Sequence, residues 1–355
     1  MTNLAARVKR VPHGCVWEIT TACNLRCIHC EVAAGAPRAG ELSTAELLDL
    51  ADQLDDLGAR RVSLTGGEPL LRKDWPQLAE RLSERGLAVK IVTNGTLLDA
   101  AAVERMIAAG VSGVAVSLDG LRELHDHIRR PKRPGPSRYD AAVRAIELLV
   151  ASPMRAGVIT QINRQNLPIL GELHELLTRL GVDTWQLQLA YPLGRALTHC
   201  GEEFIIRPAQ LPELEQQIAG FINHGRPAVV TADNIGYYGK NEPVLRFGPK
   251  DVRTFWMGCM AGCLGLCLHS DGDVKGCPTH PPQFIVGNVR DEPLADIWAD
   301  RRRFAYNTLW DEALLEGQCA RCSYRRVCRA GCTTMAFAVT GTIYDNPFCI
   351  QQACS

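Results

Sequence analysis

The stretch Thr21-Ala-Cys-Asn-Leu-Arg-Cys-Ile-His-Cys30 places Cys23, Cys27 and Cys30 in a C-x3-C-x2-C pattern, directly after an apolar, strand-like segment at 16–20. Three thiolates can hold three irons of a cubic [4Fe–4S] cluster and leave the fourth iron without a protein ligand. A structural zinc site would normally have four ligands, and a cluster that only transfers electrons usually has four cysteines. The spacing therefore predicts a cluster whose open iron binds a small molecule and passes it one electron.

The composition agrees with metal binding. The chain has 355 residues and 15 cysteines, and its first residues lack the apolar core of a secretion signal. Because stable disulfides are rare in reducing compartments, metal binding is the default role for so many cysteines. Lys+Arg and Asp+Glu are both 39, which gives no electrostatic footprint for nucleic acid or anionic lipid. With no apolar run of roughly 18–20 residues, we expect a cytoplasmic protein that binds neither nucleic acid nor membranes.

Short apolar runs alternate with amphipathic segments between residue 15 and about residue 195, which is typical of β-α units around a parallel sheet. The expected strands cover 16–20, 61–65, 89–93, 113–117, 157–162 and 185–189. The expected helices cover 44–57, 75–85, 100–109, 139–150 and 167–180. Ser43 and Glu46 form a predicted capping box. Six units suit a partial (β/α)6 TIM-like barrel, an α/β fold in which chemistry gathers at the carboxyl ends of the strands.

The character of the chain changes after residue 200. Residues 209–258 are less periodic, with one expected helix at 209–223, and residues 259–355 are turn-rich and dense in cysteine. We therefore predict an N-terminal tail at 1–12, a barrel at 13–208, a connector at 209–258 and a small cysteine-rich domain at 259–355.

Three more motifs follow the second, third and fourth expected strands. In Gly66-Gly67-Glu68 the glycines allow close approach of backbone to a ligand, and the carboxylate can accept hydrogen bonds from an ammonium group. Asn94-Gly95 and the segment 117–120 (Ser-Leu-Asp-Gly) are ordinary turn sequences when taken alone. All three nevertheless fall on the rim that carries the cysteine loop.

In this order and spacing, the motifs resemble those of the radical S-adenosylmethionine (SAM) enzymes, over residues 13 to about 195. The resemblance implies that the open iron chelates the amino and carboxylate groups of SAM. One electron from the cluster then cleaves SAM to methionine and a 5′-deoxyadenosyl radical, which abstracts a substrate hydrogen.

The resemblance also implies a set of cofactor contacts. Glu68 would hold the amino group of SAM, Ser117 the ribose, and Arg129 the carboxylate. His29 takes the position of an aromatic ring that packs on adenine in this family. The full implied set is Gly66, Gly67, Glu68, Asn94, Ser117, Arg129 and His29.

The C-terminal cysteines can be interpreted as zinc ribbons or as iron–sulfur sites, and their order resembles the SPASM extension of radical SAM enzymes. In that family two auxiliary [4Fe–4S] clusters are each bound by four cysteines, giving three clusters with the first. The resemblance implies one auxiliary cluster on Cys319, Cys322, Cys328 and Cys349. It implies the other on Cys259, Cys263, Cys277 and Cys332.

Some cysteines remain open to interpretation. Cys267 competes with Cys263 for the fourth place, although Cys267 resembles a strand residue of the hairpin. Cys15 is expected to be a buried apolar side chain. A spare thiol at the active-site mouth could donate a hydrogen atom to a substrate radical, and Cys354 and Cys200 are the candidate catalytic residues for that role.

By resemblance, we expect oxidative modification of a ribosomally made peptide or protein side chain, as a cross-link or thioether, with the auxiliary clusters accepting an electron. An external flavodoxin- or ferredoxin-like protein would supply the reducing electron. About fourteen residues precede the first strand, too few for a leader-recognition domain, so a separate leader-peptide-binding protein or the barrel itself would present the substrate.

Three alternatives remain from the sequence. One is a peptide epimerase that uses a cysteine as hydrogen donor. A second is an enzyme like the anaerobic sulfatase maturases, although Pro278 stands where that class has an aspartate. The third is a non-catalytic iron–sulfur electron carrier or sensor, which would have no use for the nucleoside-binding motifs.

Overall fold

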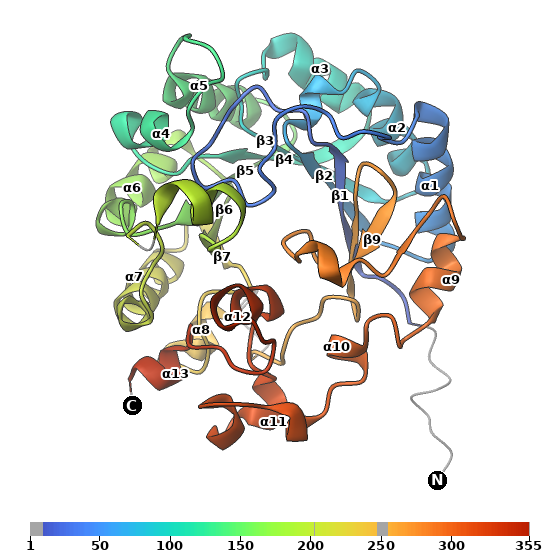
Figure 1. Ribbon diagram of the computed structural model, residues 1–355. Coiled ribbons are helices and arrows are strands. Elements are labelled where there is room, and N and C mark those ends of the chain that lie inside the picture. The colour runs from blue at the N-terminus through green and yellow to red at the C-terminus, as the bar shows by residue number, and fades with distance from the viewer. Residues whose placement is uncertain (1–9, 202, 247–254, 355) are drawn as a thin grey trace.

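The structure is a computed structural model that describes residues 10–201, 203–246 and 255–354. Residues 1–9 of the predicted tail and 247–254 of the predicted connector lie outside the described residues. The centre of the molecule is one ten-stranded sheet in the order β10-β9-β8-β1-β2-β3-β4-β5-β6-β7, which curves into a partial barrel with helices around its outer face (Figure 1).

Six parallel strands confirm the predicted barrel, each within two residues of its expected ends. They are β1 (Gly14–Thr20), β2 (Arg61–Gly66), β3 (Ala88–Thr93), β4 (Val111–Ser117), β5 (Arg155–Ile162) and β6 (Thr184–Leu189). Each is hydrogen-bonded in parallel to the next along the chain. Their carboxyl ends therefore share one rim.

Four further strands extend the sheet at both edges. β7 (Ala228–Thr231) pairs in parallel with β6, so the predicted connector contributes a seventh parallel strand. β8 (Gly265–Leu268) pairs in parallel with β1, and β9 (Asp273–Lys275) and β10 (Gly287–Asn288) continue the sheet as antiparallel strands. The cysteine-rich segment thus shares its hydrogen bonding with the first barrel strand.

Helices cover the outer face of the sheet and build the C-terminal segment. Those of the barrel and the connector are α1 (Thr44–Asp56), α2 (Trp75–Glu84), α3 (Ala100–Ala108), α4 (Arg122–Ile128), α5 (Arg138–Val150), α6 (Leu170–Leu180), α7 (Leu211–His224) and α8 (Glu242–Leu245). The C-terminal ones are α9 (Leu294–Ala299), α10 (Ala305–Thr308), α11 (Arg325–Cys328), α12 (Thr333–Thr340) and α13 (Ile350–Ala353). None of the described helices is long and apolar enough to cross a membrane.

Local signals in the sequence explain several helix ends. The predicted capping box is present, with Ser43 accepting from the backbone N–H of Glu46 and the Glu46 carboxylate accepting from that of Ser43. The helix expected at 167–180 begins as a 3-10 turn, Leu167–Ile169, before α6. The sequence analysis did not predict α4, which is only seven residues long.

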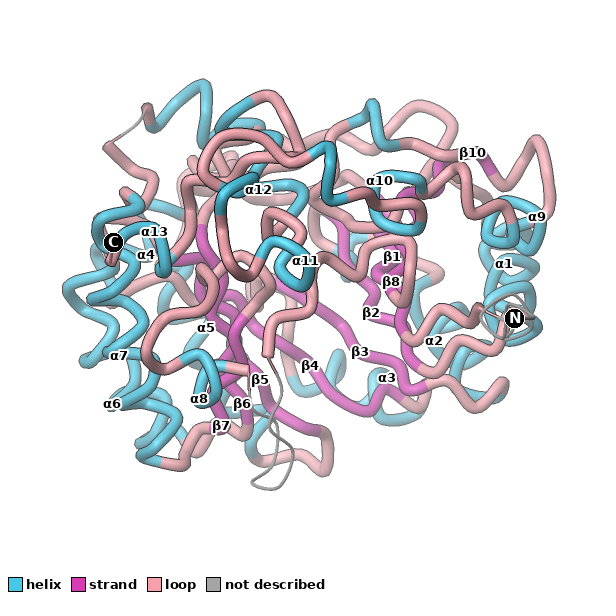
Figure 2. The backbone as a smooth tube through the Cα atoms, turned by 90° about the horizontal axis from the view of Figure 1, so that it is seen from below, coloured by secondary structure: helices cyan, strands magenta, loops and turns pink. Residues whose placement is uncertain are grey.

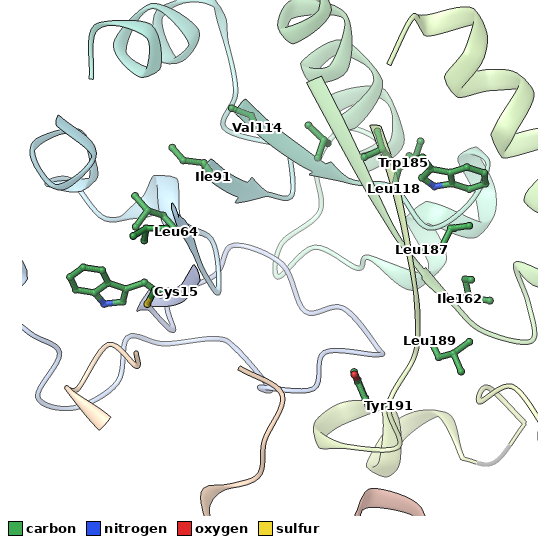
Figure 3. Packing of buried hydrophobic residues seen from close by; sticks show 14 of the residues in the cluster. Cys15, Leu64, Ile91, Val114, Leu118, Ile162, Trp185, Leu187, Leu189 and Tyr191 are labelled. Carbon is green, nitrogen blue, oxygen red and sulfur yellow. The ribbon is translucent and has the colours of Figure 1, made fainter. Parts of the chain in front are cut away.

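The two faces of the sheet differ in chemistry. Trp17 and Ile19 of β1 are fully buried in the core, whereas Val16 and Glu18 line a cavity inside the barrel. Figure 3 shows Leu64, Ile91 and Val114 of the same core projecting from the neighbouring strands β2, β3 and β4. Because side chains alternate along a strand, one face anchors the helices while the other leaves polar groups inside the barrel.

The C-terminal segment lies on the open side of the barrel. In Figure 1, α8, α12, α11 and α10 lie below β7 and β9, and α13 lies below α7. Figure 2, turned by 90°, shows α10, α11 and α12 across the same opening. This placement brings the C-terminal cysteines close to the barrel interior.

Candidate active site and auxiliary cluster sites

The cysteine loop leaves β1 and brings its three cysteines to one cavity. Cys23, Cys27 and Cys30 line a cavity of about 170 Å³, and Cys23 and Cys27 are each 8% exposed. Among the described residues, no fourth cysteine lines this cavity. Burial raises the pKa of Cys27 to about 12, so a thiolate there needs a positive ligand such as iron. The donor set fits a cubic cluster with one open iron.

Arg195, from the segment after β6, holds the loop in place. Its Nε donates to the carbonyl of Cys27 at 2.8 Å and its Nη1 to that of Ala34 at 2.9 Å. Its backbone N–H donates to the carbonyl of Cys30 at 3.0 Å. Because Arg195 is buried and makes these three hydrogen bonds, it fixes the positions of the last two cysteines from the far side of the barrel.

The glycine pair is required by close backbone packing. Gly66 has φ +147°, and a Cβ there would lie 2.1 Å from the carbonyl oxygen of Thr20. A Cβ at Gly67 would lie 2.2 Å from the carbonyl oxygen of Ala22. The first contact is with the end of β1 and the second with the cysteine loop, so the pair lets the ends of β1 and β2 meet while lining the cavity.

Glu68 lies behind the glycine pair and is fully buried. Its carboxylate accepts from the hydroxyl of Thr93 at 2.8 Å and the backbone N–H of Asn94 at 2.8 Å. It is not among the residues that line the cavity. Burial raises its pKa to about 7 despite these bonds, and a nearby ammonium group would favour the charged carboxylate. The predicted role toward the SAM amino group thus stays a prediction.

His29, Asp119 and Arg129 form a buried charged network that the sequence analysis did not foresee. The fully buried Oδ2 of Asp119 lies 2.7 Å from His29 Nε2 and 2.6 Å from Arg129 Nε. Its other oxygen accepts from the backbone N–H of Gln161 at 2.9 Å. Although burial opposes ionisation, Arg129 and then His29 hold the pKa of Asp119 well below its usual range. The network fixes the His29 ring and the Arg129 guanidinium at the cavity wall.

The remaining predicted contacts also reach the cavity. Asn94 and Ser117 both line it, and each is nine-tenths or more buried. The side-chain nitrogen of Asn94 donates to Asn24 Oδ1 at 2.9 Å. The structure therefore brings together Gly66, Gly67, Asn94, Ser117, Arg129 and His29 around the three cysteines, and leaves Glu68 one layer behind.

A second cavity of about 310 Å³ continues into the barrel. It shares His29, Glu31, Ser117, Arg129 and Gln161 with the first cavity. Its own walls carry polar side chains from β1, β6 and the segments after β8 and β9, namely Glu18, Gln186, Gln188, His269 and Thr279. This is the space in which a substrate could meet the first cavity.

The C-terminal cysteines form two groups. Burial, and then the neighbouring Cys349, Cys319 and Cys322, raise the pKa of Cys328 well above its usual value. Burial, and then Cys259 and Cys277, raise the pKa of Cys332. The neighbours of Cys328 belong to its predicted ligand set, and those of Cys332 belong to the other predicted set.

The two competing cysteines lie in different surroundings. Cys263 is half-buried, and after burial its largest influence is the neighbouring Cys259, which raises its pKa further. Cys267 is fully buried in β8, opposite Lys275 of β9. Cys263 is thus beside one of the predicted ligands.

Two contacts join cysteines of the second predicted ligand set to the barrel interior. The hydroxyl of Thr279, which lines the second cavity, lies 3.2 Å from Cys277 Sγ. The hydroxyl of Tyr191, just after β6, lies 3.6 Å from Cys332 Sγ. A ligand sulfur can only accept, so both hydroxyls would donate to a metal-bound thiolate.

The candidate hydrogen-donor cysteines do not line either central cavity. Cys200 lies in a separate surface cavity with His127 and Arg164, and its Sγ donates to the carbonyl of Ile28 at 3.3 Å. Cys354 is exposed at the end of α13. Cys15 is buried in the core, as expected.

Comparisons with known proteins agree with this geometry. The family model described as the radical SAM superfamily matches residues 17–177, and that of an iron–sulfur cluster-binding domain, SPASM, matches residues 259–323. An AdoMet-dependent heme synthase of Methanosarcina barkeri is 31% identical over 96% of this chain and 97% of that protein. The chain belongs to the radical SAM superfamily. It is a radical SAM enzyme with a SPASM region, and its family uses SAM, a [4Fe–4S] cluster and auxiliary clusters.

Other similar proteins carry different names from the heme synthase. The mycofactocin maturase MftC of Mycobacterium tuberculosis is 30% identical over 94% of this chain and 82% of that protein. Among solved structures, anSMEcpe with bound AdoMet has a TM-score of 0.74 at 16% identity, over 97% of this chain and 95% of that one. Streptococcus suis SuiB bound to S-adenosylmethionine has a TM-score of 0.72 at 18% identity, over 95% of this chain and 76% of that one. The two solved structures support the fold.

Proposed function

We propose that this enzyme oxidises a side chain of a ribosomally synthesised peptide or protein, forming a cross-link or thioether. The carrying observation is the contact between Thr279, which lines the second cavity, and Cys277, a proposed auxiliary-cluster ligand, at 3.2 Å. An electron acceptor next to the substrate suits a reaction in which the substrate radical must lose one electron to give the oxidised product. The names of MftC and of SuiB bound to its precursor peptide support a peptide substrate.

In this proposal, SAM on the loop cluster supplies a hydrogen-abstracting radical when both are bound. Arg129, oriented by Asp119, would face the SAM carboxylate, and Ser117 its ribose. His29 would pack beside adenine with its ring fixed by Asp119 at 2.7 Å. Glu68 would neutralise the amino group, and the protein walls would exclude water from the reacting hydrogen.

The auxiliary sites are proposed to hold one cluster each. Cys319, Cys322, Cys328 and Cys349 would bind one, and Cys259, Cys263, Cys277 and Cys332 the other. With the loop cluster, this predicts about twelve irons per chain. A flavodoxin- or ferredoxin-like protein would reduce the enzyme, and a separate leader-peptide-binding protein could deliver the substrate.

We also propose the division into tail, barrel, connector and C-terminal unit at the boundaries given above.

The exposed position of Cys354 and the outer position of Cys200 argue against an epimerase that uses either thiol. Pro278 lines the cavity at the position directly after Cys277 where sulfatase maturases have an aspartate, which argues against sulfatase maturation.

A second candidate is oxidation of a tetrapyrrole, because relatives named AdoMet-dependent heme synthase and Fe-coproporphyrin III synthase align over most of the chain. The deciding experiment incubates anaerobically reconstituted enzyme, dithionite and SAM with synthetic peptides encoded next to the gene, or with iron coproporphyrin III. Mass spectrometry should find a peptide that has lost hydrogen, together with 5′-deoxyadenosine. Conversion of the tetrapyrrole, with every peptide unchanged, would overturn the proposal.

A further inference from the structure

A basic groove lies beside the cysteine loop, where the segment that joins α4 to α5 packs against it. The groove has a volume of about 470 Å³, and its charged lining residues are Lys132, Arg133, Arg138 and Arg144. Its described lining residues include no carboxylate. Because the whole chain has as many acidic as basic residues, this positive charge is a local feature and not a consequence of composition.

The cations of the groove are only weakly neutralised by the described protein. Arg133 and Arg144 are exposed and form no ion pair with any described residue. The exposed Lys132 donates to the neutral carbonyl of Gly35 at 2.7 Å. Arg138 has the one nearby carboxylate, that of Asp126, at 3.9 Å. The groove therefore keeps most of its positive charge for a binding partner.

The segment that carries these cations is attached to the cysteine loop through its backbone. The N–H of Arg26 donates to the carbonyl of Arg130 at 2.7 Å, and Pro131 lies opposite Leu25 in an antiparallel bridge. Three of the six residues 131–136 are proline, whose ring fixes φ. The cations are thus held in place relative to the cysteines, which lowers the entropy lost when a partner binds.

Leu25 separates the groove from the cavity of the three cysteines. It lines both spaces and is 3% exposed. Its backbone N–H donates to the Sγ of Cys23 at 3.4 Å. A protein docked in the groove would therefore lie one residue away from a ligand of the loop cluster.

The arginines beside the C-terminal cysteines are more fully engaged. The chain has four of them between residues 321 and 329. Arg325 and Arg326 share the carboxylate of Glu312 at 3.9 and 2.8 Å, and Arg329 lies over the ring of Trp310 at 5.4 Å. Figure 1 shows α4 and α5 at the upper left of the molecule and α11 at the bottom. Of these two faces, the groove offers an acidic partner the less neutralised charge.

The chemistry of the groove selects the kind of partner. Opposite charge steers association and sets orientation, so the partner should be acidic. No aromatic ring is among the described lining residues, although the bases of a nucleic acid would need such rings for stacking. Redox proteins form weak complexes through small interfaces, which suits a shallow groove that adjoins a cluster ligand.

We propose that this groove is the docking site of the external electron donor, an acidic flavin or iron–sulfur protein. One electron passes from the reduced donor to the loop cluster. The donor is thereby oxidised by one electron, the cluster is reduced by one, and no bond is made or broken. The inference rests on the external donor proposed above and adds the place where it binds. It holds whether the substrate is a peptide or a tetrapyrrole.

The first test measures binding to the reconstituted full-length enzyme by anaerobic biolayer interferometry. The probes are a flavodoxin and a ferredoxin of net negative charge encoded in the same genome, both oxidised. Arg133→Gln/Arg144→Gln should weaken binding of the tighter probe about fivefold, since each exposed ion pair contributes little. Arg133→Lys/Arg144→Lys keeps both charges and should keep the affinity. At about 1 M salt, where the Debye length is about 3 Å, the wild type and the glutamine variant should bind equally weakly.

The matched control is Arg60→Gln/Arg105→Gln. It makes the same chemical change and the same change in net charge at exposed positions outside the groove, and it should leave the affinity unchanged. Iron content per chain and SAM affinity check that each variant is assembled.

The second test locates the contact. A water-soluble carbodiimide joins a lysine amine of one protein to a carboxylate of the other, and Lys132 is the one lysine that lines the groove. Mass spectrometry should find the donor cross-linked to Lys132 and not to the exposed Lys73, Lys90 or Lys240. Lys132→Arg should remove the cross-link and keep the affinity, because the charge remains.

Four results would overturn the inference. They are no binding of either probe by the wild type at low salt, equal effects of the groove and control variants, cross-links only at lysines outside the groove, and weakened binding of an acidic precursor peptide with donor binding unchanged. The last result would assign the groove to the substrate.

The two proposals can fail separately. If the donor binds in the groove but iron coproporphyrin III is converted in place of a peptide, only the peptide function is wrong. If a peptide is oxidised with dithionite as reductant but the groove variants bind the donor like the wild type, only the docking site is wrong.

Discussion

The cysteine loop at 21–30 and the C-terminal segment at 259–349 both carry buried cysteines, but their surroundings differ. The three loop cysteines open onto a cavity that reaches the barrel interior, and no fourth described cysteine joins them there. The C-terminal cysteines gather in groups with one another as neighbours, and their hydroxyl contacts come from Thr279 and Tyr191. If the proposed ligand sets are right, the difference teaches that an incomplete ligand set leaves an iron open for reaction, whereas complete sets suit electron transfer.

The sharpest way to break this comparison is to remove a loop cysteine. Cys27→Ala should abolish 5′-deoxyadenosine formation and lower the iron content by about four per chain, because two remaining thiolates cannot hold the loop cluster. Colorimetric iron analysis and chromatography of the SAM products measure both. Retained SAM cleavage in this variant would contradict the assignment of the open iron to the loop.

Substitution of a cysteine in the C-terminal segment should stop product formation without stopping SAM cleavage. Cys322→Ala should also lower iron by about four per chain, but the loop cavity is intact and 5′-deoxyadenosine should still form. Oxidised product should be lost, since the electron has no acceptor. Equal loss of SAM cleavage and product would instead mean that the auxiliary site is needed to assemble the barrel.

The comparison also separates what the sequence could predict from what it could not. The six strands, the cysteine spacing and the Gly66-Gly67 pair are local signals, and backbone geometry at Gly66 explains why no other residue would serve. The pairing of β8 with β1 joins residues far apart in sequence. Nothing in a local pattern specifies such a contact, so the shared sheet was not predicted.

The polar residues of the site show the same limit. Asp119 stood within a quoted turn motif, yet its bonds to His29 and Arg129 depend on how three rim segments meet. Glu31 and His269 are far apart in the sequence but line the same cavity. No sequence spacing indicates that they lie there together. The position of Asp119 at the carboxyl end of a strand is the one signal that could have marked it.

A smaller effect is expected at the disputed auxiliary ligand. Cys263→Ser should lower the iron content and change the electron paramagnetic resonance signal of one auxiliary cluster, because Cys263 lies beside Cys259. Cys267→Ser, in the interior of β8, should keep the full iron content and lose only some stability. Loss of iron in the Cys267 variant but not in the Cys263 variant would make Cys267 the fourth ligand of that auxiliary cluster.

The smallest expected effect lies at the boundary between the two regions, at Tyr191. Its hydroxyl is 3.6 Å from Cys332 Sγ, and hydrogen bonds to ligand sulfurs raise the reduction potential of a cluster by stabilising its reduced form. Tyr191→Phe removes one neutral hydrogen bond, of about 1 kcal/mol, which corresponds to about 40 mV for a one-electron couple. Potentiometric titration followed by electron paramagnetic resonance should show one auxiliary signal shifted to lower potential by this amount. The loop signal should not move, and it serves as the internal control. A shift of the loop signal alone would place Tyr191 in the reaction site and not in the electron-accepting site.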